Sequence, residues 1–388
     1  MCKITYIDEV EIKRKTVLLR VDFNVSLNPD HSISNDERIK QSLPTITYLL
    51  KNDNRLIIIS HLGRPKSYDK TLSLKIVVDQ LKKYLPNVPI LLEKNFDQIK
   101  EKKETIVVLE NIRFFPEEKN YSEKFAKKLA FLADIYVNDA FGVCHRTDTS
   151  VIGPPKFIPA YGGLLLKKEV ETISKVIKNP KKPFVAIIGG AKISTKLPLL
   201  YKLTEIADYL LIGGGLANTF FCAQGLEIGQ SFCEYEQVAA ARKLLFHAAQ
   251  KKTAVILPSD VIIGDPKNSE NGGEVKKIDE IPKGAIILDI GPQTQAQFGS
   301  IIAKAKTIIW NGPIGLFENK AFRRGTDFIY YAITQNSQAT SIVGGGDTLA
   351  AISKKEYLDK ITHISTGGGA MLEFIEKGTL PGIEALKK

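Results

Sequence analysis

Short apolar runs rich in β-branched residues alternate with stretches of helical period along the whole chain. Runs such as TVLLRVDF (16–23), FVAIIGGAK (184–192) and TSIVGGGD (340–347) have the length and composition of buried strands. Between such runs, SEKFAKKLAFLA (122–133) and EYEQVAAARKLLFHAAQ (234–250) repeat apolar residues at helical spacing. Strands separated by helices predict βαβ units, so we expect an α/β fold with parallel sheets and helices on both faces.

The chain has 388 residues, which is long for one compact core and predicts two domains with a cleft. A boundary near residue 170 is indicated by the segment 160–183. In it, a stretch of helical period follows Gly162 and Gly163 and is closed by Asn179 and Pro180. We expect this segment to be a hinge helix. The expected division is an N-terminal domain over 1–170, a C-terminal domain over 171–370, and a segment over 371–388 that packs back on the first domain.

Glycine and arginine are distributed in opposite directions along the chain. Of 29 glycines, 5 precede residue 171, whereas 7 of the 10 arginines do. Both residue types gather at the carboxyl ends of predicted strands, where open parallel sheets bind their ligands. We therefore expect an arginine-lined site in one domain that faces a glycine-lined site in the other.

Four stretches of the second half share one plan, an apolar strand that runs into glycines and then a helix. They are IIGGAKISTK (187–196), LIGGGLANTF (211–220), IVGGGDTLAA (342–351) and ISTGGGAMLE (364–373). Without Cβ atoms, successive amides can approach an anion, and a helix N-terminus adds partial positive charge. Tight strand-to-helix packing is the alternative for any single stretch, but four in one domain favour a phosphorylated ligand. P-loop and dinucleotide fingerprints are absent from the sequence.

Three charged residues accompany these glycines. Asp347 either caps the following helix or coordinates Mg²⁺ carried by a polyphosphate. Lys192 and Lys196 have the spacing of one helical turn, so we expect both to reach one bound anion, with a solvated surface pair as the alternative.

Arginines of the first half lie next to predicted strand ends. Arg38, Arg64, Arg113 and Arg146 occupy such positions, and their guanidinium forks suit carboxylate or phosphate, although salt bridges to nearby acids are the alternative for each. Asp22 and Asn24 end the first strand, while His61 and His145 neighbour two of the arginines. A lone histidine is more often structural than catalytic.

Composition excludes some other classes of protein. The net charge of +11 is spread evenly, whereas a nucleic-acid-binding protein is expected to cluster its lysines and arginines with aromatic residues. The uncharged window 209–226 contains glycines and polar residues and fits a strand, loop and helix better than a membrane span. Four widely spaced cysteines and a start without a secretory pattern predict reduced thiols and a cytoplasmic location.

Eight motifs follow one another along the chain: RVDFNV, SHLGRP, LENIRF, NDAFG followed by HR, GGAK with a second lysine, WNGPIGLFE, GGGDT and STGGGA. In order and spacing they resemble the phosphoglycerate kinase family, over about residues 17 to 386. The resemblance implies two Rossmann-like three-layer domains. It also implies reversible Mg²⁺-dependent transfer of a phosphoryl group between 1,3-bisphosphoglycerate and ADP, giving 3-phosphoglycerate and ATP in glycolysis and gluconeogenesis. The N-terminal domain of that family binds the glycerate and the C-terminal domain binds the nucleotide.

The resemblance also implies site residues. The glycerate-binding set comprises Asp22, Asn24, Arg38, His61, Leu62, Gly63, Arg64, Arg113 and Arg146. The nucleotide-binding set comprises Lys196, Gly213, Gly214, Asn311, Gly312, Glu318, Gly344, Gly345, Gly346, Asp347 and Thr348, with Glu318 on the ribose and Asp347 near the metal. The transferred phosphoryl group would meet Arg38, Lys192 and the amides of Gly367, Gly368 and Gly369.

The sequence departs from the family pattern at Ser26, Asp148 and Gln293, which leaves local rigidity and affinity open. A carboxylate acceptor is already ionised at neutral pH, so no general base is expected, and His61 is assigned to binding. Two substrates on separate domains would require domain closure. By resemblance the chain is expected to act as a monomer, without nucleic acid or membrane. Another α/β enzyme, such as a sugar-nucleotide transferase, is the alternative that the motif order disfavours.

Overall fold

The computed structural model describes residues 3–267, 272–352 and 355–387. The chain divides into two compact units, which are described separately below. Unit 1 comprises Met1–Glu171 with Lys377–Lys388, and unit 2 comprises Thr172–Glu376. The division falls inside helix α5 (Leu164–Lys178), which therefore contributes residues to both units.

The last residues of the chain belong to unit 1. Helix α13 (Pro381–Glu384) is anchored there because the amide of Gly382 donates to the carbonyl of Cys144 at 2.8 Å. An isolated antiparallel bridge also pairs Ile4 with Lys387.

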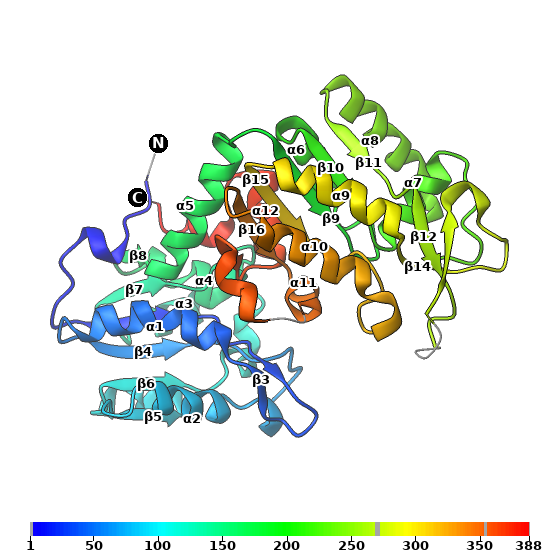
Figure 1. Ribbon diagram of the computed structural model, residues 1–388. Coiled ribbons are helices and arrows are strands. Elements are labelled where there is room, and N and C mark those ends of the chain that lie inside the picture. The colour runs from blue at the N-terminus through cyan, green and yellow to red at the C-terminus, as the bar shows by residue number, and fades with distance from the viewer. Residues whose placement is uncertain (1–2, 268–271, 353–354, 388) are drawn as a thin grey trace. The chain divides into compact units, whose positions relative to one another are not determined.

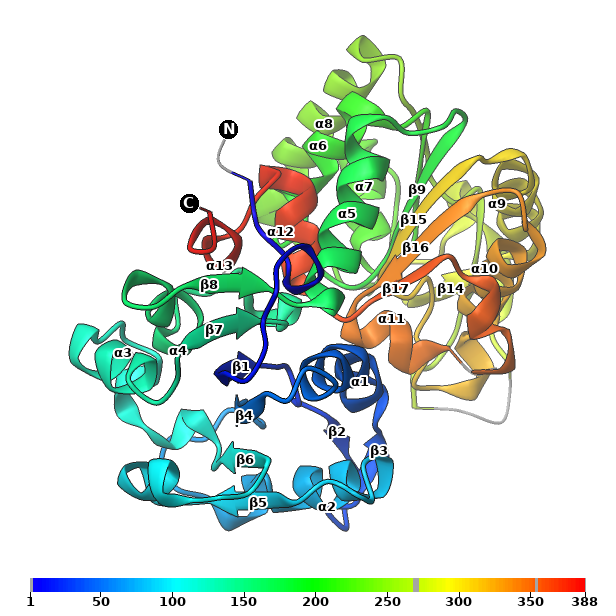
Figure 2. The same ribbon diagram turned by 90° about the vertical axis from the view of Figure 1, so that its left-hand side faces the viewer.

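Unit 1 contains a parallel six-stranded sheet in the order β5-β6-β4-β1-β7-β8 (Figure 1 and Figure 2). Its strands are β1 (Thr16–Arg20), β4 (Arg55–Ile59), β5 (Ile90–Glu93), β6 (Ile106–Leu109), β7 (Ile135–Asn138) and β8 (Ala160–Gly162). Its further helices are α1 (Glu37–Leu50), α2 (Lys75–Tyr84), α3 (Glu123–Ala130) and α4 (Thr149–Ile152). Figure 2 shows α1 and α2 on one face of this sheet and α3 and α4 on the other.

Burial on both faces explains why the strands of this sheet are continuously apolar. Alternate residues of β1, such as Val17 and Leu19, pack with Ile46 of α1 and Val77 of α2 in one buried cluster. Helix α3 begins where its sequence predicts, because the Ser122 side chain accepts from the amide of Phe125.

Unit 2 contains a second parallel six-stranded sheet, in the order β11-β10-β9-β15-β16-β17. Its strands are β9 (Phe184–Ile188), β10 (Tyr209–Ile212), β11 (Ala254–Ile256), β15 (Thr307–Asn311), β16 (Thr340–Gly344) and β17 (His363–Ser365). Its further helices are α6 (Leu197–Ile206), α7 (Leu216–Ala223), α8 (Val238–Gln250), α9 (Pro292–Lys304), α10 (Arg324–Gln335), α11 (Gly346–Ala351) and α12 (Gly369–Lys377). Trp310 at the sheet centre packs with Phe298 of α9 and Ile329 of α10 in the buried core. The α/β class and the parallel sheets predicted from the sequence are confirmed.

Two antiparallel additions were not foreseen from the sequence. Strands β12 (Asp260–Ile263), β13 (Glu274–Lys277) and β14 (Ile287–Ile290) form a small antiparallel sheet, and β2 (Ser26–Leu27) pairs with β3 (Ile33–Asn35). Strands β2, β3 and β13 are short and mostly polar, so they give no strand signal in the sequence. Strands β12 and β14 are mainly apolar, a composition that is the same in either kind of sheet.

The uncharged window over 209–226 folds as β10, a glycine turn and α7. In the part of the chain that the structure describes, no helix is both long and apolar enough to cross a membrane.

Candidate active site

A charged cluster forms where β1 and β4 end in unit 1. The buried carboxylate of Asp22 accepts a hydrogen bond from the guanidinium of Arg38, and its other oxygen lies 3.9 Å from Nδ1 of His61. Burial raises the pKa of Asp22, but Arg38, His61 and Arg20 more than offset this, and the pKa falls to about 2. Asp22 therefore holds Arg38 at the strand ends as a fixed counter-charge.

Arg20, which the sequence analysis did not single out, is a buried member of this cluster. Its Nε donates to Oγ of Ser150 at 2.9 Å, and its Nη2 lies 3.3 Å from Nδ1 of His61. The Ser150 hydroxyl donates in turn to Glu118 at 2.6 Å. In the sequence, Arg20 stands out only as a charged residue inside the apolar run 16–23. Its role could not be inferred from there, because its partners are distant along the chain.

Loop amides close to His61 are held by asparagine side chains. Asn24 accepts from the amide of Gly63 at 2.8 Å, and Asn111 donates to the carbonyl of Leu62 at the same distance. Gly63 has φ +65°, which a residue with a side chain rarely adopts, and a Cβ there would meet Leu72 at 2.8 Å. This turn therefore requires glycine.

Arg113 and Arg146 bring further positive charge to the same strand ends. Arg113 donates to the carbonyl of Gly63 at 2.5 Å and lies 3.9 Å from Asp148. Burial and the neighbouring Arg146 lower the pKa of Arg113 to about 10. The Nε atoms of both arginines are buried and have no hydrogen-bond partner among the described residues. The described part of the chain therefore leaves these two donors unsatisfied.

The structure places most of the predicted glycerate set in this cluster. Nδ1 of His61 lies 3.9 Å from Asp22 and 3.3 Å from Nη2 of Arg20. Asp22, Arg20, Arg113 and Arg38 also act electrostatically on the pKa of His61. Burial, the largest of the effects, lowers the pKa of His61 well below its usual value. Arg64 differs from the others because its side chain is exposed.

In unit 2, glycine turns follow three neighbouring strands, β9, β10 and β15. Gly190, Gly214 and Gly312 have φ values of +93°, +68° and +94°. A Cβ on Gly214 would lie 2.7 Å from the backbone of Gly190, so these turns pack backbone against backbone. The predicted Gly213 extends the sheet contact, with its amide donating to the carbonyl of Ile188 at 3.0 Å.

Lys196 is inserted between these turns. Its Nζ donates to the carbonyl of Gly189 at 2.6 Å and lies 3.4 Å from the carbonyl of Asn311. Burial lowers the pKa of Lys196 to about 8, and the nearby Asp347 opposes this shift. The helical turn expected to join Lys192 and Lys196 is absent, because α6 begins at Leu197 and the preceding residues form a turn. Lys192 is exposed, and the helical argument for a shared direction of the two lysines was therefore wrong.

The β15 and β16 ends are joined by side-chain hydrogen bonds. Asn311 donates to the carbonyl of Gly344 at 2.7 Å, and Thr348 accepts from the amide of Gly312 at 2.7 Å. Gly345, with φ +112°, precedes α11, and Gly346 is exposed at the start of that helix. These bonds fix the GGGDT segment against the neighbouring glycine turn.

The GGG segment before α12 also forms a turn. The amide of Gly367 donates to Oγ of Ser365 at 3.1 Å, Gly368 has φ +46°, and Gly369 opens the helix.

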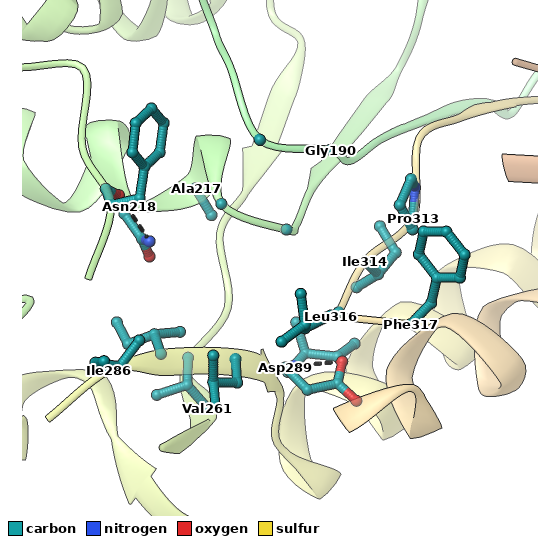
Figure 3. Close-up of a pocket in the computed structure, with 18 of the residues that line it drawn as sticks. Gly190, Ala217, Asn218, Val261, Ile286, Asp289, Pro313, Ile314, Leu316 and Phe317 are labelled. Atoms are coloured by element: carbon teal, nitrogen blue, oxygen red, sulfur yellow. Dashed lines mark hydrogen bonds between the residues drawn. The ribbon is translucent and has the colours of Figure 1, made fainter. Parts of the chain in front are cut away.

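Next to the glycine turns lies a cavity of about 440 Å³ (Figure 3). Figure 3 shows Ala217 and Asn218 on one wall, Val261 and Ile286 on another, and the Pro313–Phe317 segment on a third. Of the predicted nucleotide-binding residues, Gly214, Glu318 and Asp347 line it. Most of the apolar lining was missed, because such residues look like ordinary core positions in the sequence.

Two carboxylates of this cavity are exposed, Glu318 and Asp347. The described residues contain no group of three or more metal-ligating side chains. A single accessible carboxylate suits Mg²⁺, which is usually bound by one or two carboxylates together with substrate phosphates. Asp347 therefore fits the expected metal.

A family model described as phosphoglycerate kinase matches residues 7–378. The chain belongs to the phosphoglycerate kinase family. A phosphoglycerate kinase of Dictyoglomus turgidum is 44% identical, with both chains covered in full. A relative named phosphoglycerate kinase 3, cytosolic, of Arabidopsis thaliana is 42% identical over 97% of this chain and 96% of its own.

Solved phosphoglycerate kinases share the fold. The structure from Coxiella burnetii is 41% identical, covers 99% of both chains and has a TM-score of 0.88. That from Pyrococcus horikoshii is 32% identical, covers 99% of this chain and 98% of its own, and has a TM-score of 0.81. The chain is thus an enzyme with phosphoglycerate kinase activity, a glycolytic kinase.

The three departures from the phosphoglycerate kinase pattern occupy defined places. Ser26 is exposed in β2, and Gln293 donates its backbone amide to Asp260 at 2.9 Å. Asp148 lies beside Arg113 in the charged cluster, so this departure is the one that bears on the site.

Proposed function

We propose that unit 1 binds 3-phosphoglycerate or 1,3-bisphosphoglycerate and unit 2 binds MgATP or MgADP, between which the chain transfers a phosphoryl group. The observation that carries the proposal is the cluster of buried and half-buried arginines at the strand ends of unit 1. Its guanidinium groups outnumber its carboxylates, and Nε of Arg113 and of Arg146 makes no hydrogen bond within the described part of the chain.

A phosphorylated carboxylic acid matches this cluster in charge and geometry. Guanidinium forks bind carboxylate and phosphate with paired hydrogen bonds. Arg38, Arg64, Arg113 and Arg146 supply such forks, and Asn24 and Asp22 position the loop and Arg38 around the ligand. Because burial holds His61 neutral at pH 7, it is suited to hydrogen bonding and not to proton transfer.

A nucleotide matches the cavity of unit 2. Its apolar walls, including Ile287 and Leu288, suit a base, and exposed Glu318 suits the ribose hydroxyls. The glycine turns give backbone amides access to the phosphates, and Lys196 supplies positive charge. Mg²⁺ held by Asp347 and the phosphates would neutralise negative charge during transfer.

Transfer to a carboxylate needs alignment and charge neutralisation more than proton transfer. We assign this task to Arg38, Lys192 and the amides of Gly367, Gly368 and Gly369. Reacting atoms must come within near contact and water must be excluded, so the two units have to approach each other during turnover.

The proposal extends to the state of the protein in the cell. We assign the chain a monomeric, cytoplasmic role that needs neither nucleic acid nor membrane. Plant relatives are named cytosolic, which supports the location.

A coupled assay with 3-phosphoglycerate and ATP tests the proposal. We expect ADP formation that requires both substrates and is lost when a chelator removes Mg²⁺. Turnover that persists without 3-phosphoglycerate, or with a sugar in its place, would contradict the substrate assignment.

A further inference from the structure

Two cysteine thiols meet in unit 2, each next in sequence to a residue that lines the cavity. Sγ of Cys233 lies 3.3 Å from Sγ of Cys222, which is in α7. Cys222 and Cys233 are both free thiols and both partly exposed. Cys144, by contrast, is buried. The pair is therefore the place in the described part of the chain where two accessible thiols are in contact.

The residues beside these thiols line the cavity. Phe221 precedes Cys222 and Phe232 precedes Cys233, and both phenylalanines belong to the lining. Asn218 of α7, also in the lining, donates to the carbonyl of Phe232 at 3.0 Å. A bond between the sulfurs would thus link α7 covalently to the segment of Phe232, which a hydrogen bond joins in the present structure.

The residue after Cys233 connects this wall to the predicted catalytic lysine. Glu234 accepts from the amide and the hydroxyl of Ser194, at 3.0 Å and 2.6 Å, and Ser194 is two residues from Lys192. Movement of the 232–234 segment would therefore be transmitted to the segment that carries Lys192.

We propose that Cys222 and Cys233 are a reversible redox site, oxidised to a disulfide by a small-molecule disulfide such as oxidised glutathione, and that the disulfide weakens nucleotide binding. A disulfide holds its sulfurs about 2.05 Å apart, so the present 3.3 Å separation must shorten. The shortening would draw together the segments that hold Phe232 and Phe221, both of which line the cavity. The kinetic part of this inference rests on the proposed nucleotide site, whereas disulfide formation does not.

The reaction is thiol–disulfide exchange in two steps. Burial raises the pKa of Cys222, and Cys233 lies in a loop whereas Cys222 lies in α7, so we assign the first attack to Cys233. Its thiolate attacks one sulfur of oxidised glutathione, whose disulfide bond breaks, and one glutathione thiolate leaves. The sulfur of Cys222 then loses its proton and attacks Cys233, which releases the second glutathione. Two protein thiols are oxidised and one glutathione disulfide is reduced.

The test uses the full chain with Cys2→Ser, so that residue 2 contributes no adduct. After oxidised glutathione, we expect a mass lower by two hydrogen atoms, peptides that map the loss to Cys222 and Cys233, and full reversal by dithiothreitol. In Cys222→Ser, the same treatment should leave one glutathionyl group on Cys233. The reduced parent protein is the folded control in each case.

Kinetics complete the test. The oxidised enzyme should have a KM for ATP about threefold or more above that of the reduced enzyme, with a smaller change in kcat. Cys233→Ala lacks the thiol that attacks first and cannot form the disulfide, so oxidised glutathione should leave its KM for ATP unchanged. Alkylation of both thiols after oxidation overturns the proposal, as does a KM for ATP that is the same in both redox states. A loss of all ATP dependence in the reduced enzyme would instead count against the proposed function.

Discussion

Nζ of Lys196 donates to the carbonyl of Gly189 at 2.6 Å, which ties the residue before α6 to the end of β9. Burial lowers the pKa of Lys196 to about 8, against the opposing effect of Asp347. An anionic nucleotide favours the protonated amine, so the KM for ATP should rise as pH increases through about 8 and the amine loses its charge. We expect about a tenfold rise per pH unit well above that value.

Lys196→Ala checks this assignment. Loss of a charged hydrogen-bond donor should raise the KM for ATP by about 10-fold to 100-fold. The variant should also lose the rise in KM above about pH 8 that belongs to the lysine. If the KM for ATP depends on pH in the same way in the variant and in the parent protein, Lys196 does not contribute to nucleotide binding through its charge.

Arg64→Ala should chiefly weaken glycerate binding. Because Arg64 is exposed and forms no ion pair or hydrogen bond with the described residues, its removal should change the free energy of unfolding by less than about 0.5 kcal/mol. The KM for 3-phosphoglycerate should rise about 10-fold to 100-fold while that for ATP stays constant. Lys13→Ala removes an exposed cation of the same unit and serves as the matched control. Unaltered glycerate affinity would contradict the assignment.

Lys192→Ala should chiefly lower turnover. If Lys192 neutralises charge on the phosphoryl group in transit, kcat should fall about 10²-fold to 10³-fold, with a small change in the KM for ATP. Steady-state kinetics with both substrates varied measures the two effects separately. Lys243→Ala, an exposed lysine of α8, should retain normal turnover. Normal kcat in Lys192→Ala would show that this lysine has no catalytic role.

Asp347→Asn should raise the Mg²⁺ requirement. The exposed carboxylate is the protein ligand that we assign to the metal, so half-maximal activity should need about tenfold more Mg²⁺. A titration of free Mg²⁺ at saturating ATP measures this, with Asp279→Asn as an exposed acidic control. If the variant and the parent protein need the same free Mg²⁺ concentration, Asp347 is not a ligand of the metal, which the nucleotide alone would then hold.

The sheets and glycine turns were predictable because their causes are local. A strand buried on both faces must be apolar along its whole length, and a backbone with positive φ, as at Gly190 and Gly345, selects glycine. Residue spacing predicted sites for anions. Only the resemblance to family motifs assigned individual residues to a particular reaction.

What the sequence did not reveal depends on contacts between distant residues. Arg20 acquires its place from Ser150 and His61, and Phe232 becomes a cavity wall because α7 lies beside it. The prediction that Lys192 and Lys196 point in one direction was wrong, because residues four apart share a face only inside a helix, and α6 begins at Leu197.

Asp139 should make unit 1 less stable as pH rises towards 7. Its Oδ1 accepts from the amides of Leu165 and Leu166 at the start of α5, and Oδ2 is buried. Burial raises the pKa of Asp139 to about 7, although Thr45 and the two amides oppose the shift.

Because the pKa of the folded form lies above the ordinary 3.8, the folded chain binds the proton more tightly than the unfolded chain. The stabilising contribution is complete below about pH 4, and on the order of 4 kcal/mol is lost as pH rises through 7. Asp139→Asn keeps the acceptor oxygen without the charge. Urea denaturation at several pH values should therefore show the variant gaining stability relative to the parent protein between about pH 4 and 7. A stability difference that is independent of pH would mean that Asp139 titrates as it does in the unfolded chain.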